Sequence, residues 1–277
     1  MRLLGSPGAP VRLLQLLLPA SLVLADPDWP LRAATGSAQA LLGNFAFGGG
    51  SGEQLSSASA MEIPVSHYPA NRAAGVVLHY LTYQRGSPHR LFEMGRVNQA
   101  RLEDIPGTGH KYHLKFEVKQ SIQNGNSLNC TAEILYHHGG TTVAPEIHYA
   151  MEGEFETHLK EADNVFYNRI QHLSEPLETK NIPDSYGNMP AEMKPIFNLA
   201  KVASGYIVWQ NSTENTWYNM IQIQNVKQVK RNDDYLEFSY EVLFHDIASQ
   251  EIIPWHMQVL WHPQHGVKVT QNSRQSK

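Results

Sequence analysis

Histidine is the residue type that most invites a chemical role in this sequence, which contains 14 of them. His158 with Glu161, and His172 with Glu175, have the H-x-x-E spacing of a zinc-ligand pair, which can place both side chains on one face of a helix. The pattern is common by chance, and the H-E-x-x-H motif of metalloproteases does not occur. We therefore expect these pairs to be ordinary surface residues, with no metal and no cofactor bound.

A catalytic nucleophile has equally little support. Cys130 is the single cysteine, so neither an intramolecular disulfide nor a thiolate metal cluster can form. Its neighbours, "LNCTAEILY", indicate a strand, which predicts a buried, inert thiol. There is no G-x-S-x-G elbow, and the glycines at 48–50 lie outside the strand–helix context of a phosphate-binding loop. The sequence therefore favours a binding protein over an enzyme.

The charge balance argues against a nucleic-acid partner. The net charge is −4 and the pI is about 6.4, whereas proteins that bind phosphate backbones usually present a basic face. The densest basic run, at 227–231, is followed at once by Asp233 and Asp234. Hydrophobic residues make up 42% and charged residues 17%, a balance that lets a chain of this length bury a core. We expect a globular monomer that binds neither nucleic acid nor membrane.

Residues 1–60 differ from the rest because they are rich in small and apolar residues and poor in charge. The apolar run Leu13–Ala25 follows two arginines and has the form of a secretory signal, but it is too short to span a bilayer. A glycine- and serine-rich stretch then indicates a flexible linker. Met61 opens the globular pattern and is an alternative start of translation. We expect 1–60 to be a disordered extension.

Two locations therefore stay open. The protein is cytoplasmic if translation starts at Met61, and secreted if the segment 13–25 serves as a signal. Two N-glycosylation triplets begin at Asn129 and Asn211, and they matter only in a secreted protein.

Short matches recur in the same order in both halves of the globular part. "HYLTYQ" (His79–Gln84) resembles "GYIVWQ" (Gly205–Gln210), and "VNQA", "FEV" and "LYH" later find counterparts in "VKQV", "YEV" and "LWH". All four pairs keep a spacing of about 125 residues, which is too long for a solenoid repeat. The pattern predicts a domain that is present twice.

Each copy begins with a predicted helix. The first starts at Pro69 and the second at Pro190, since a missing N–H is tolerated in the first turn. Apolar residues then recur at helical spacing, namely Ala73, Val76, Val77, Tyr80 and Leu81 in the first copy and Met193, Ile196, Phe197, Ala200, Ala203 and Ile207 in the second. Gly75 and Gly205 cost their helices about 1 kcal/mol each relative to alanine, so we expect another element, such as the other helix, to approach closely there.

After each helix the apolar residues alternate with polar ones. The stretches "KYHLKFEV", "YLEFSYEVLF" and "IIPWHMQVLW" show this pattern, which is typical of antiparallel sheets that are covered on one face. Turn signals such as "IPGTG" and "RNDD" separate the runs. We therefore predict an α+β fold with two tandem subdomains, in each of which one helix packs on a curved four-stranded antiparallel sheet.

A linking helix is expected between the copies, in "EADNVFYNRIQHLSEP" at 161–176. Asp163 suits its first turn, and Phe166, Ile170 and Leu173 form a narrow apolar stripe. The stretch 177–189 is expected to follow as an ordered loop. The predicted organisation, from the N-terminus, is extension 1–60, subdomain 61–156, linking helix and connector 157–188, and subdomain 189–277.

One helix on a four-stranded antiparallel sheet, present twice, is a cystatin-like architecture. Seven stretches are informative, namely "MEIP" at 61, "GHKYHLKFEV" at 109–118, "NCTAEILY" at 129–136, "NIPDSYGN" at 181–188, "WQNSTENTWY" at 209–218, "KRNDD" at 230–234 and "HDIASQEIIPW" at 245–255. In these stretches the chain resembles the latexin family. The resemblance covers the chain from Met61 to about Arg274 and is specific because seven motifs occur in order. Related retinoid-induced and eggshell-matrix proteins share "QEIIP" and "NDD" but match less of the rest.

The resemblance implies a noncatalytic inhibitor of zinc-dependent metallocarboxypeptidases of the A/B type. In that family the two subdomains pack through their helices, the enzyme docks at the seam between them, and its active-site funnel is covered. The inhibitor itself needs no zinc. The alternative is a secreted matrix or structural protein of the same family without strong protease inhibition, and an enzyme is the least favoured class. The Q-x-V-x-G hairpin with which cystatins block papain-type enzymes is missing from both copies, which argues against that activity.

The turn at 245–251, "HDIASQE", is the predicted contact with the enzyme. It joins two strands that core packing explains, whereas His245, Gln250 and Glu251 have no evident task in a core. Loops held by rigid strands are common binding sites. The alternative is a conformational turn in which Asp246 and Ser249 bond the local backbone.

Overall fold

The structure, a computed structural model, describes residues 60–121, 127–139, 143–155 and 159–276. All of them lie in one compact unit, Ala34–Lys277. The predictions made for residues 1–60 fall outside the described residues, apart from Ala60. None of the helices in the described part of the chain combines the length and the apolar character that a membrane span requires.

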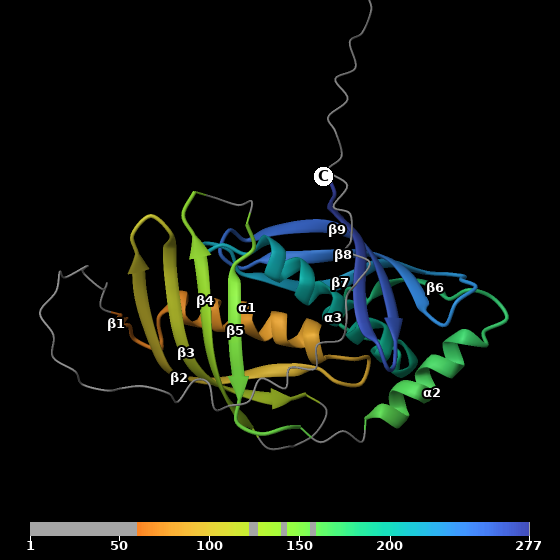
Figure 1. The fold of residues 1–277 in the computed structure, drawn as a ribbon. Coiled ribbons are helices and arrows are strands. Elements are labelled where there is room, and N and C mark those ends of the chain that lie inside the picture. Colours follow the sequence, from red (N-terminus) through yellow and green to blue (C-terminus); the bar gives the residue numbers. More distant parts are fainter. Residues whose placement is uncertain (1–59, 122–126, 140–142, 156–158, 277) are drawn as a thin grey trace, which may run out of the picture. The chain divides into compact units, whose positions relative to one another are not determined.

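Two five-stranded antiparallel sheets, each with one long helix, make up the described fold (Figure 1). In the first sheet the strands follow the order β1-β2-β3-β4-β5. These strands are β1 (Met61–Glu62), β2 (Phe92–Ile105), β3 (Gly109–Gln120), β4 (Leu128–His137) and β5 (Glu146–Met151). The helix α1 (Tyr68–Arg85) packs against β2, β3, β4 and β5.

The second sheet has the order β10-β9-β8-β7-β6 and carries its own helix. Its strands are β6 (Glu178–Ile182), β7 (Tyr218–Val229), β8 (Leu236–Asp246), β9 (Glu251–His262) and β10 (Gly266–Arg274). The helices are α2 (Lys160–Gln171), the short 3₁₀ helix η1 (Ala191–Met193) and α3 (Lys194–Asn211). Each sheet therefore has the chain order strand, helix, four strands, and the strand before the helix pairs with the first strand after it.

The apolar residues that alternate along the predicted strands form the two hydrophobic cores. In β8 every second residue from Leu236 to Asp246 is buried, and in β9 the same holds from Ile253 to Trp261. Apart from Asp246, these side chains pack with the apolar residues of α3, including Ile196, in one core. The matching residues of β3 and β4 pack with α1 in the other, where Cys130 is fully buried. Burial raises the pKa of the Cys130 thiol to about 12, so this cysteine is inert, as predicted.

The four sequence matches fall on corresponding elements. The pairs lie on α1 and α3, on β2 and β7, on β3 and β8, and on β4 and β9. Two tandem cystatin-like subdomains, as the sequence predicted, are the fold of the described residues.

Each sheet nevertheless has one strand more than predicted. The additional strands are β1, which has only two residues, and β6, which lies in the stretch 177–189 that was expected to be a loop. Neither strand carries an apolar alternation, because both are edge strands with mostly exposed side chains. Hydrogen bonding to the neighbouring strand defines β1 and β6, and this pairing leaves no local pattern in the sequence.

The described part of the predicted linking segment 157–188, which begins at Leu159, packs with the second subdomain. Phe166 and Ile170 of α2 belong to the second core, and β6 pairs with β7. The helix ends at Gln171, so Leu173, which was predicted to extend its apolar stripe, lies beyond it and is 37% exposed.

Candidate functional site

The helices α1 and α3 form the centre of a seam between the two subdomains (Figure 1). The backbone of Gly205 approaches α1 so closely that an added Cβ would lie 2.3 Å from the carbonyl oxygen of His79. Aromatic rings pack along the same contact. The ring centroids of Tyr83 and Tyr206 are 5.2 Å apart, and those of Tyr80 and Trp209 are 4.8 Å apart.

Hydrogen bonds join the two subdomains at one end of the seam. The buried amide of Asn198 on α3 donates a 2.8 Å hydrogen bond to the carbonyl oxygen of Pro88, in the loop after α1. In the same loop, the backbone N–H of His89 and its Nδ1 both bond Asp163 Oδ1 of α2, at 3.2 and 2.9 Å. The carboxylate of Asp163 is almost fully buried. The sequence placed Asp163 correctly in the first turn of α2, but its partner in the other subdomain was not foreseen.

Glu214 joins the two subdomains by hydrogen bonds at the other end of the seam. It lies between α3 and β7, and its carboxylate accepts hydrogen bonds from two side chains of β3 in the other subdomain. The bond from His110 Nδ1 is 2.8 Å long and that from the Tyr112 hydroxyl is 2.7 Å long. Burial, and then the Glu214 carboxylate, raise the pKa of Tyr112 well above its ordinary value, so the hydroxyl remains a donor.

The turn at 245–251, the predicted contact with the enzyme, lies near this end. It is connected to the seam through Trp217. The backbone N–H of Trp217 donates to Asp246 Oδ1 at 2.8 Å, and its carbonyl accepts from Ile247. Its ring meets that of Tyr68 at the start of α1, with centroids 6.2 Å apart, and Tyr68 is 71% exposed. We use the name seam edge for Tyr68, Trp217 and the turn 247–250.

The conformation of this turn is set by Asp246. Besides Trp217, its carboxylate accepts from the N–H of Ala248 and from the hydroxyl of Ser249, at 3.2 and 2.7 Å. Burial acts to raise the pKa of Asp246, but the hydrogen bonds from Trp217, Ser249 and Ala248 outweigh it and hold the pKa below its ordinary value. The local backbone bonding that the sequence suggested is therefore present for Asp246, whereas the Ser249 hydroxyl bonds the Asp246 carboxylate and not the backbone.

The three predicted contact residues do not all converge. His245 pairs with Ile252, whereas Glu251 pairs with the buried Asp246, so His245 and Glu251 lie on opposite faces of the sheet. Glu251 forms an ion pair with Arg274 at 3.2 Å. Gln250 is exposed, has a positive φ of 61°, and donates its amide to the carbonyl of Ile247.

Sequence reasoning missed Tyr68 and Trp217 as candidate contact residues. Both are aromatic residues that stand outside the alternating strand patterns, Tyr68 before the proline that starts α1 and Trp217 before β7. An aromatic residue at the end of an element, without a place in its apolar stripe, is the signal that could have identified them.

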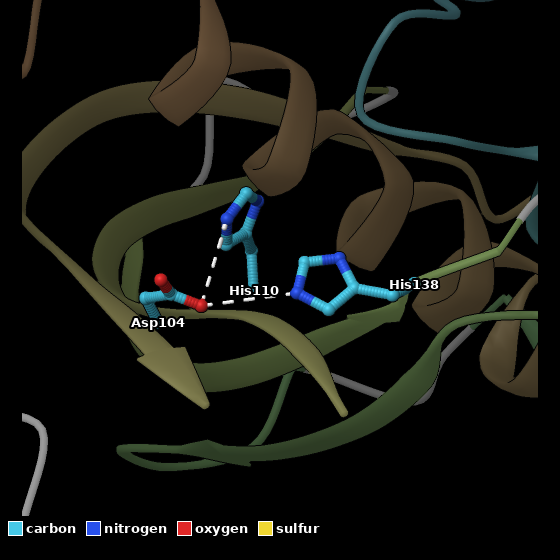
Figure 2. Close-up of side chains that lie close together, drawn as sticks. All are labelled: Asp104, His110 and His138. Carbon is cyan, nitrogen blue, oxygen red and sulfur yellow. Dashed lines mark ion pairs between the residues drawn. The ribbon is translucent and has the colours of Figure 1, made fainter. Parts of the chain in front are cut away.

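A candidate metal site lies beside Glu214 and contains none of the H-x-x-E residues. Asp104, His110 and His138 form the one group of three potential ligands found in the described part of the chain, with ligand atoms within 4.8 Å of one another (Figure 2). Of the H-x-x-E residues, His158 lies outside the described residues. His172 Nδ1 donates to the carbonyl of Asn168 within α2.

Comparison with known proteins finds similar sequences over most of the chain. The sequence model of the latexin family matches residues 63–277. Latexin of Homo sapiens is 58% identical over 217 residues, which cover 78% of this chain and 98% of that protein. Latexin of Mus musculus is 57% identical over the same coverage. Ovocalyxin-32 of Gallus gallus is 33% identical over 205 residues, 74% of each chain. The chain belongs to the latexin family.

Proposed function

We propose that this protein is a noncatalytic inhibitor of zinc-dependent metallocarboxypeptidases of the A/B type and that it acts as a monomer. Its membership of the latexin family carries this proposal. The protein covers the active-site funnel of the enzyme with the seam between its subdomains, and it contributes no catalytic group or cofactor.

The construction of the seam supports this mode of action. A protein that is already rigid before it binds loses less conformational freedom on association. Here the hydrogen bonds of Asn198 and Asp163 hold one end of the seam, and those of Glu214 hold the other. The close contact of α1 with Gly205 holds the centre. The surface offered to the enzyme is thus preorganised.

Within the seam, the seam edge is the proposed contact. Tyr68 offers an exposed aromatic ring, a residue type that often anchors protein interfaces. The adjoining turn offers the exposed side chain of Gln250 on a backbone that Asp246 holds in place. His245 and Glu251 flank this turn on opposite faces of the sheet, so we propose that an enzyme seated over the turn meets both.

The test is inhibition of a purified A-type zinc carboxypeptidase by the full chain and by the double variant His245→Ala/Gln250→Ala. We expect the wild type to inhibit and the variant to inhibit about 10- to 100-fold less, as for central contacts of an interface. The matched control is Gln264→Ala/His265→Ala, which removes the same two residue types from the exposed turn at the far end of β9. We expect this control to inhibit like the wild type.

Melting temperatures complete the test. Weaker inhibition with unchanged melting supports a direct contact, whereas an equal loss of folding stability would favour a purely conformational turn. Undiminished inhibition by the double variant would remove the turn from the interface. Absence of inhibition by the wild type would overturn the proposed function and leave the matrix or structural alternative. Peptidase activity of the protein itself would instead show that it is an enzyme.

A further inference from the structure

The backbone brings Asp104, His110 and His138 to the same end and the same face of the first sheet. Asp104 and His110 are directly paired across the β2–β3 hairpin, and His110 is paired with Tyr136 of β4. His138 follows two residues after Tyr136, just beyond the end of β4 at His137. Its N–H bonds the carbonyl of Thr108 at 2.8 Å, which holds it beside the hairpin.

The three side chains converge without hydrogen bonds between them, and the rings of His110 and His138 meet edge to face with centroids 5.1 Å apart. Figure 2 shows both imidazole rings directed at one oxygen of Asp104. The Nε2 atoms of His110 and His138 each lie 3.8 Å from Asp104 Oδ1, which is too long for a hydrogen bond. Three potential ligand atoms thus lie within 4.8 Å of one another around a common gap.

Glu214 prepares His110 for such a role. Because a carboxylate can only accept, the 2.8 Å contact requires a proton on His110 Nδ1, which leaves the Nε2 lone pair of the neutral ring directed at the gap. A carboxylate bonded to the outer nitrogen of a histidine is the usual second shell of a zinc-bound imidazole, where it orients the ring and raises its basicity. With Asp104, it also gives the site two negative charges for one divalent cation.

We propose that Asp104, His110 and His138 form a binding site for Zn²⁺, completed by water. Two imidazoles and one carboxylate suit zinc, whereas Mg²⁺ and Ca²⁺ prefer oxygen ligands alone. Tetrahedral zinc requires ligand atoms about 3.3 Å apart. The side chains of Asp104 and His138 are 68% and 50% exposed, so they can rotate to close the 3.8 Å separations around the ion.

Zinc at this site stabilises the contact between the subdomains. Glu214 belongs to the second subdomain, whereas the three ligands belong to the first. A metal on His110 Nε2 makes the Nδ1–H a stronger donor to Glu214, so the ion favours the closed seam. The site is separate from the proposed enzyme contact turn, and its existence does not depend on carboxypeptidase inhibition.

Calorimetric titration of the metal-free full chain with Zn²⁺ tests the proposal, and Mg²⁺ serves as the comparison ion. His138→Ala removes an exposed ligand without touching the bonds of Glu214, and we expect it to weaken the zinc binding of this site by about tenfold or more. Glu214→Gln keeps every ligand but loses the carboxylate behind His110, and we expect binding about 10- to 100-fold weaker. The matched control is His172→Ala, which we expect to bind zinc like the wild type.

Thermal unfolding gives an independent measurement on the same proteins. Zinc should raise the melting temperature of the wild type and of His172→Ala, and should raise that of His138→Ala less, because only ions that bind the folded state stabilise it. The proposal fails if zinc does not bind, if Mg²⁺ binds as tightly, or if His138→Ala binds zinc like the wild type. It also fails if His172→Ala alone loses zinc, since the ion would then occupy another site.

Discussion

At the scale of single residues, His79 shows how the seam changes the chemistry of a side chain. It lies on α1, where that helix meets α3. Burial, and then the positive charge of Lys201, lower the pKa of His79 from 6.5 to about 4. The neutral imidazole is therefore the form that the folded protein accommodates.

This pKa predicts a loss of stability in mild acid. Above pH 6.5 His79 is neutral in both states, and between pH 6.5 and 4 only the unfolded chain binds the proton. The free energy of unfolding therefore falls as the pH is lowered through this window, by about 2 kcal/mol from His79 by pH 4.5. In urea titrations at pH 7.5 and 4.5, we expect His79→Gln to lose about 2 kcal/mol less than the wild type. Equal losses in both proteins would contradict the prediction.

Among the helices, Gly75 of α1 and Gly205 of α3 differ in how closely another element approaches them. Both were expected to mark a close approach. A Cβ at Gly205 would meet backbone and side-chain atoms of α1, with the His79 carbonyl at 2.3 Å and Tyr83 Cβ at 3.1 Å. A Cβ at Gly75 would meet only Trp217 Nε1, at an ordinary 3.9 Å. The expectation is therefore confirmed for Gly205 and wrong for Gly75.

The matched variants Gly205→Ala and Gly75→Ala should consequently differ in sign. Alanine favours a helix by about 1 kcal/mol over glycine, and at Gly75 nothing opposes this gain. At Gly205 the new methyl group forces α1 and α3 apart, and overpacking of this kind costs about 1–3 kcal/mol or more. In urea unfolding we expect Gly75→Ala to be more stable than the wild type and Gly205→Ala to be less stable. A Gly205→Ala protein as stable as Gly75→Ala would show that the helices separate freely.

At the scale of the whole molecule, two cores are joined by one seam. The buried apolar residues of the first core run from Ala70 to Tyr136, and those of the second run from Phe166 to Trp261. Both sets lie beyond Met61, where the composition of the chain changes.

We therefore predict that the fragment 61–277 folds without residues 1–60. The fragment keeps both cores and both ends of the seam, so its melting temperature should lie within about 2 °C of that of the full chain, a difference of less than about 1 kcal/mol. Thermal unfolding of the two proteins, followed by far-UV circular dichroism, provides the comparison. A large drop in the melting temperature of the fragment would place the boundary of the folded part upstream of Met61.

Local periodicity was enough to predict most helices and strands and the faces that they bury. Strand and helix periodicities are local, so the alternation in 235–244 and 252–261 was enough to identify β8, β9 and their buried residues. The strands β1 and β6 have no apolar alternation, so the local pattern did not predict them. The matches between the two halves added the architecture, because corresponding elements keep their order.

The contacts between elements, in contrast, follow from the tertiary structure. Strand register sets Asp104 opposite His110 and His138 beside them, and it puts His245 and Glu251 on opposite faces. Helix packing across the seam determines that Glu214 bonds β3 and that Trp217 meets Tyr68. Such contacts join residues far apart in sequence, and their formation depends on register and on helix approach, which no local periodicity specifies.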